Sequence, residues 1–114
     1  MPHFVIDCSE KIIALKSPSE IMQEVYDTAH STKLFDEGDI KVRINPFEHY
    51  NVGNTEDDFI HIFANIMEGR TVSQKQNLSK MIVSTLKIMF PDVPIISMNI
   101  RDFEKATYFN KSMV

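Results

Sequence analysis

Proline at position 2 is the residue whose type and place in this chain could most directly do chemistry. The second residue is small, so removal of Met1 is expected, and Pro2 would then carry a free secondary amine. An α-amino group has a pKa closer to neutrality than a lysine side chain, and a base works best when its pKa lies near the working pH. A free Pro2 amine could therefore move protons. If Met1 is retained, the Pro2 nitrogen is an amide and cannot act as a base, and Pro2 merely begins a strand.

The other residue types that often catalyse reactions are placed less favourably. Three of the histidines, His3, His30 and His49, are too scattered to predict a metal site. His61 alternates with two phenylalanines in the sequence, which is more typical of a packed histidine than of a catalyst. Cys8 falls on the apolar face of a predicted strand, so we expect a small buried residue rather than a nucleophile.

Hydrophobic spacing predicts the elements that must position Pro2. Residues alternate between apolar and polar in four predicted strands, at 2–8, 40–44, 58–67 and 94–103. Two amphipathic helices are predicted between them. The first begins at Pro18 after an N-cap at Ser17, and the second begins near Thr71 or Ser73 and ends before Pro91. Residues 45–57 are rich in Pro, Gly, Asn and Asp, and predict a loop.

The order strand–helix–strand therefore occurs twice, in pseudo-repeats at about 2–45 and 58–103. Each half can form a right-handed β-α-β unit with parallel strands. The predicted fold is α+β, a single domain over residues 1–114, with a four-stranded sheet and both helices on one face. The other face would expose Val5, Phe59 and Phe63. Uncovered apolar surface of this kind usually marks an interface, so we expect an oligomer that packs through it.

Composition excludes several classes of function. The formal net charge is -4, which argues against a general nucleic-acid or anionic-membrane binder. No apolar run approaches the length of a membrane span, and no signal peptide is apparent. A single cysteine forms no intrachain disulfide, which fits a reducing compartment and predicts a cytoplasmic protein. An anionic ligand would need a local cluster of cations.

Two segments carry a resemblance to a known family. The opening "MPHFVIDCS" and the central "MEGRTVSQKQNLSKMI" are similar to the tautomerase superfamily, and within it to the family of 5-carboxymethyl-2-hydroxymuconate isomerases. The likeness runs from Pro2 to about residue 103. The "EGR" turn followed by Ser and Gln-Lys also resembles the shorter 4-oxalocrotonate tautomerases.

The resemblance implies a homotrimer that needs neither a metal nor an organic cofactor. It implies a small anionic substrate, a dienol with several carboxylates, that is ketonised with the Pro2 amine as the base. The family's turn arginine matches Arg70. Its second-strand arginine falls on Lys41, with Arg43 two residues later on the same strand face. Which of these two supplies the second cation stays open.

This chemistry is physically reasonable, but each of the three cations could also have a purely structural role. An apolar pocket and nearby cations would both lower the pKa of the amine, and the cations would attract carboxylates and stabilise a developing dienolate. Arg70 could instead be a loop arginine that satisfies carbonyls, and Lys41 and Arg43 could lie on a solvated strand face. Two functional alternatives also remain: a tautomerase acting on phenylpyruvate-type enols or unsaturated halo acids, and a trimeric binding protein without activity.

Overall fold

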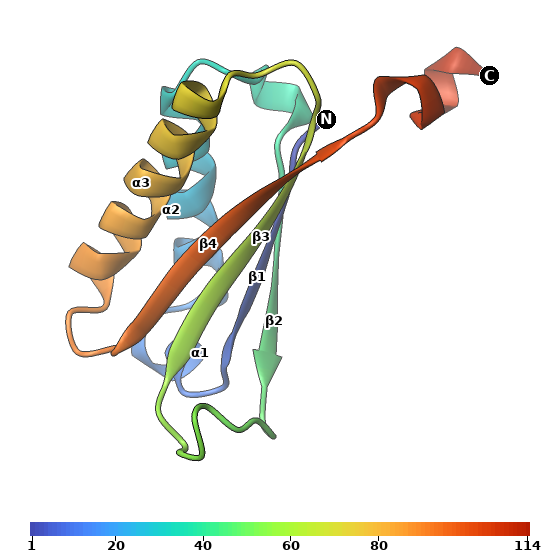
Figure 1. The fold of residues 1–114 in the computed structure, drawn as a ribbon. Coiled ribbons are helices and arrows are strands. Elements are labelled where there is room, and N and C mark those ends of the chain that lie inside the picture. Colours follow the sequence, from blue (N-terminus) through green and yellow to red (C-terminus); the bar gives the residue numbers. More distant parts are fainter.

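A four-stranded mixed sheet forms the centre of the computed structural model, which describes all residues 1–114 (Figure 1). The strands lie in the order β2-β1-β3-β4. Their bounds are β1 His3–Ser9, β2 Lys41–Phe47, β3 Phe59–Met67 and β4 Ile95–Phe103. β1 pairs in parallel with β2, β3 pairs in parallel with β4, and β1 and β3 are antiparallel at the centre. The predicted α+β fold with two β-α-β units is confirmed.

Helices cover one face of this sheet (Figure 1). The two long ones are α2 (Pro18–Ser31) and α3 (Val72–Met89), which connect the strands of each parallel pair. A short helix, α1 (Ile12–Leu15), precedes α2 and was not predicted. The side chains between sheet and helices form one cluster of 17 buried residues, which includes Cys8. None of the helices combines the length and hydrophobicity that crossing a bilayer requires.

Side-chain caps fix where the two long helices begin. The Ser17 hydroxyl accepts a hydrogen bond from the Glu20 backbone N–H, and Pro18 occupies the first turn, as predicted. For α3, the structure selects Thr71 over Ser73. The Thr71 hydroxyl accepts from the Gln74 N–H, and the Gln74 side chain accepts from the Thr71 N–H, which completes a capping box.

The capping box predicts an asymmetry between Thr71 and Ser73. Thr71→Ala should lower the free energy of unfolding by about 1 kcal/mol, because the first turn of α3 loses a partner for an otherwise unpaired N–H. Ser73→Ala, two residues later in the same turn, should change the free energy of unfolding by less than about 0.5 kcal/mol. Thermal or urea unfolding of the two variants measures the difference. Equal destabilisation would show that the capping box does not set the start of α3.

The predicted loop over 45–57 is wrong at its start. Strand β2 continues through Asn45, Pro46 and Phe47, and the Phe47 carbonyl accepts a hydrogen bond from the Glu10 N–H. A proline is compatible with this position because β2 is an edge strand and the missing donor interrupts no central ladder. The tail after Phe103 has two short 3-10 turns, Lys105–Thr107 and Lys111–Met113, and extends away from the sheet (Figure 1).

The sheet face opposite the helices is uncovered in the monomer (Figure 1). It carries the expected apolar side chains, with Val5 and Phe59 partly exposed and Phe63 41% exposed. Polar side chains surround them. His61 is packed as expected: its ring nitrogens each lie 2.6 Å from a neighbour on β4, Ser97 Oγ and Asn99 Oδ1. The face is therefore mixed rather than wholly apolar.

Candidate active site

The start of β1 places Pro2 beside the first residue of β2. The Pro2 carbonyl accepts a hydrogen bond of 3.1 Å from the Lys41 backbone N–H, and His3 is the register partner of Lys41. The Pro2 side chain is fully buried. Because β3 runs antiparallel to β1, its last residues and the turn that leads to Arg70 lie at this same end of the sheet. The topology thus brings three segments together: the N-terminus, the start of β2 and the turn between β3 and α3.

Lys41 directs its ammonium group toward the chain's N-terminus. Its Nζ donates to the Asp39 carbonyl at 2.9 Å and lies 3.7 Å from the Met1 sulfur. The residue is exposed, so the ammonium group keeps access to solvent and to an incoming anion. The two contacts place a cation within reach of the residue that precedes Pro2.

Arg70 follows the turn between β3 and α3, where Gly69 has a φ of +120° that L-residues rarely adopt. Its Nη2 donates to the Leu34 carbonyl at 2.7 Å, and its Nη1 donates to the Met67 carbonyl at 3.2 Å. Its guanidinium carbon lies 4.9 Å from the centre of the Phe35 ring. Arg70 does satisfy carbonyls, yet a guanidinium has five N–H donors, and these two bonds leave three for a ligand.

The terminal amine lies near the charges of both cations and of two carboxylates. Burial is the main cause that lowers the pKa of the Met1 amine from its ordinary value of 8.0, and the charges of Lys41 and Arg70 lower it further. The carboxylates of Asp39 and Asp36 act in the opposite direction. Partial burial and two nearby cations favour the neutral form of the amine, in which its lone pair can accept a proton. Sequence reasoning missed both carboxylates, having assigned "DEGD" only to a turn.

Arg43 lies further along the uncovered face. Its Nη1 is 3.1 Å from His3 Nδ1, which must accept because the guanidinium can only donate. Its register partner on β1 is Val5 rather than a residue at the N-terminus. Of the two candidates for the second cation, the structure brings Lys41 to the amine and pairs Arg43 with His3.

The contact between Arg43 and His3 predicts how the pKa of His3 responds to a mutation. Burial first, then the charges of Arg43, Lys41 and the N-terminus, hold the pKa of His3 below its ordinary value of 6.5. Arg43→Gln should raise the pKa of His3 toward 6.5, because a protonated imidazole would no longer face a guanidinium. Lys80→Gln, on the outer helix layer, should leave it unchanged. A histidine NMR titration measures both variants; an unmoved His3 midpoint in Arg43→Gln would contradict the contact.

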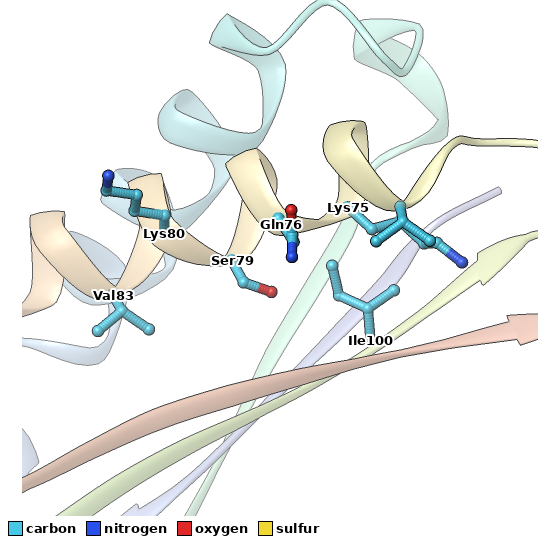
Figure 2. Close-up of a pocket in the computed structure, with 7 residues that line it drawn as sticks. Lys75, Gln76, Ser79, Lys80, Val83 and Ile100 are labelled. Carbon is cyan, nitrogen blue, oxygen red and sulfur yellow. The ribbon is translucent and has the colours of Figure 1, made fainter.

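The surface has two hollows of interest, and only one of them includes a residue of the candidate site. One, of about 420 Å³, is lined by Arg70 together with Leu34, Glu68 and Gly69. A larger groove of about 560 Å³ lies between α3 and β4, where Ile100 points toward the helix (Figure 2). The larger groove does not include the N-terminus or Arg70. The larger groove therefore does not coincide with the candidate site at the cation-lined end of the sheet.

Cys8 and the metal-ligand residue types are not placed for chemistry. Burial is the main cause that raises the pKa of the Cys8 thiol to about 11, which disfavours the reactive thiolate. No three or more His, Cys, Asp or Glu side chains are grouped to hold a metal ion.

Comparison with known proteins finds one matching family and one similar curated protein. The family model for 5-carboxymethyl-2-hydroxymuconate isomerase matches residues 2–114. The 5-carboxymethyl-2-hydroxymuconate Delta-isomerase of Escherichia coli is 24% identical over 92 residues, covering 79% of this chain and 73% of that protein.

Solved structures of low sequence identity share the fold. A 5-carboxymethyl-2-hydroxymuconate isomerase from Deinococcus radiodurans R1 superposes with a TM-score of 0.84 at 21% identity, over 96% of this chain and 88% of that one. A fused 4-OT protein described as a symmetric trimer gives a TM-score of 0.80 at 12% identity, over 98% and 94% of the two chains.

Proposed function

Because this chain belongs to the 5-carboxymethyl-2-hydroxymuconate isomerase family, we propose that it ketonises a polycarboxylate dienol such as 5-carboxymethyl-2-hydroxymuconate. The Pro2 amine, exposed by removal of Met1, is the general base. The reaction uses no metal or organic cofactor. It serves the breakdown of ring-cleavage products of aromatic acids in the cytoplasm.

The observation that carries this proposal is the meeting of three groups at one end of the sheet. The buried start of β1 lies where the charges of Lys41 and Arg70 both lower the pKa of the terminal amine. With Met1 absent, the amine moves onto Pro2, one residue deeper in the same site. Base and cations then stand together, as the transfer of a proton within an anionic substrate requires.

Proton transfer in this site follows a simple sequence. The neutral Pro2 amine accepts the proton of the dienol hydroxyl, and the oxygen's electrons form a carbonyl while the conjugated double bonds shift. The protonated amine then returns the proton to a carbon at the far end of the diene. Arg70 and Lys41 hold the substrate's carboxylates and stabilise the negative charge that develops between the two steps. No atom is gained or lost.

The two cations contribute unequally. Arg70 offers a planar fork that matches a carboxylate, whereas Lys41 is a flexible point charge. We assign the bidentate carboxylate contact to Arg70, and electrostatic attraction and charge stabilisation to Lys41. We assign Arg43, whose guanidinium contacts His3, a secondary role in substrate binding.

The proposed assembly is a homotrimer that covers the exposed sheet face. Phe63 packs against the His61 ring, with ring centroids 4.4 Å apart, yet 41% of its surface stays exposed within the chain. Trimeric relatives of the same fold support this state. Light scattering at micromolar concentration should give three times the chain mass of 13.2 kDa, and a monomer would contradict the assembly.

Ultraviolet-monitored ketonisation tests the proposed activity. Untagged protein should convert 5-carboxymethyl-2-hydroxymuconate far faster than the spontaneous reaction. The same preparation should be tested with the enol of phenylpyruvate and with a 3-halo-acrylate. Preference for either would assign a different tautomerase-type reaction, and inactivity with all three would favour a binding protein.

A further inference from the structure

One loop holds both cations of the candidate site. The connection from α2 to β2 spans residues 32–40, and its backbone carbonyls accept hydrogen bonds from both side chains. The Leu34 carbonyl accepts from Arg70, and the Asp39 carbonyl accepts from Lys41. The two cations come from different β-α-β units, and this loop contacts both of them.

Phe35 gives the loop a rigid surface beneath Arg70. The ring is 7% exposed, and its edge-to-face contact with Phe4 of β1 has a centroid distance of 6.0 Å and an interplanar angle of 77°. Its face receives the Arg70 guanidinium at 4.9 Å. The ring is thus fixed by the core on one side and attracts a cation on the other.

Three contacts from two segments restrain the guanidinium. The Leu34 carbonyl and the Phe35 ring belong to the α2–β2 loop, and the Met67 carbonyl belongs to the end of β3. An arginine side chain loses considerable rotamer entropy when a ligand immobilises it. A guanidinium already held in place loses less when it captures a carboxylate, so the held state favours binding.

We propose that Phe35 is a positioning residue that acts through Arg70 and sets the affinity of the site for the substrate's carboxylate. This inference rests on the proposed function, in which Arg70 binds a carboxylate of the dienol. Phe35 does not touch the reacting atoms. Its loss therefore weakens substrate binding and leaves the proton transfer itself largely unchanged.

The kinetic test compares three variants. Phe35→Leu keeps an apolar side chain but removes the aromatic face, and should raise KM for 5-carboxymethyl-2-hydroxymuconate about 3- to 10-fold with kcat changed less than about twofold. Phe35→Tyr keeps the ring and should restore KM. Phe90→Leu is the matched control: Phe90 is 3% exposed and follows α3 at the end opposite Arg70, so it should lose stability without a change in KM. Unchanged KM in Phe35→Leu, or an equal rise in Phe90→Leu, would overturn the inference.

A spectroscopic measurement tests the contact without turnover. The Arg70 side-chain N–H signals, assigned by their absence in Arg70→Lys, should carry an upfield ring-current shift in the wild type and lose it in Phe35→Leu. If wild-type protein fails to turn over the dienol, the proposed function fails by itself. Calorimetric binding of propane-1,2,3-tricarboxylate then decides the inference: weaker binding by Phe35→Leu supports it, while equal binding or none by the wild type overturns it.

Discussion

Replacing Pro2 with alanine is expected to lower kcat/KM for ketonisation by at least about 100-fold, the usual scale of a lost general base. Alanine is also small, so Met1 should still be removed, and a primary amine then stands at the same position. That amine lacks the ring that the fold buries completely, so its direction toward the substrate is less fixed. Some residual activity is therefore compatible with the proposed role.

Pro18→Ala provides the matched control for Pro2→Ala. Pro18 occupies the first turn of α2 and is not one of the candidate site's residues. Its replacement should change stability slightly and leave kcat/KM within about twofold, because a proline at this place lacks only an N–H that needs no helical partner. Undiminished ketonisation by Pro2→Ala, confirmed free of Met1 by intact mass, would remove the proline amine from the mechanism.

Removal of the Arg70 side chain is expected to have an effect of similar size. Arg70→Ala should lower kcat/KM for polycarboxylate dienols about 100-fold, mainly through a higher KM with some loss of kcat, since a charge that faces both the carboxylate and the developing dienolate is lost. Arg70→Lys should recover part of this activity because it restores the charge but not the fork. Steady-state kinetics over a range of substrate concentrations separates the two parameters.

Stability must be measured beside these kinetics. Arg70→Ala also leaves the carbonyls of Leu34 and Met67 without their donors, but the site is only partly buried and water can replace them. We therefore expect a small change in thermal stability. Lys87→Ala removes an exposed cation from the last turn of α3, far from the site, and should leave KM unchanged. An Arg70→Ala enzyme with wild-type kinetics would exclude Arg70 from substrate binding.

The sequence predicted most of the fold because its strands and helices carry strong local signals. Period-two alternation marked β1 and β3 since one face of each is buried. The cap at Ser17 marked the start of α2, whereas the start of α3 stayed open between Thr71 and Ser73 until the structure selected Thr71. The extension of β2 through Pro46 was not predicted, because proline usually signals a turn and its tolerance depends on β2 being an edge strand. The sheet order depends on contacts between distant segments, which local patterns do not contain.

The candidate site also has residues that the sequence could identify and residues that it could not. Pro2 and Arg70 were identifiable from the family-like segments around them, and Lys41 and Arg43 from their shared strand face. Sequence alone could not choose between those two, because the choice depends on register: Lys41 pairs beside Pro2, whereas Arg43 lies beside Val5. Phe35 had no local signal as a site residue. Its contact with Arg70 joins residues 35 positions apart and exists only in the folded chain.

The central claim is that a free Pro2 amine, and not merely a proline at the start of β1, performs the proton transfer. The most direct test compares one protein in two forms, with Met1 removed and with Met1 retained, each verified by intact mass and by the same thermal midpoint. The account predicts rapid ketonisation of 5-carboxymethyl-2-hydroxymuconate by the Met1-free form and at least about 100-fold slower turnover by the form in which the Pro2 nitrogen is an amide. Equal activity of the two forms would contradict it.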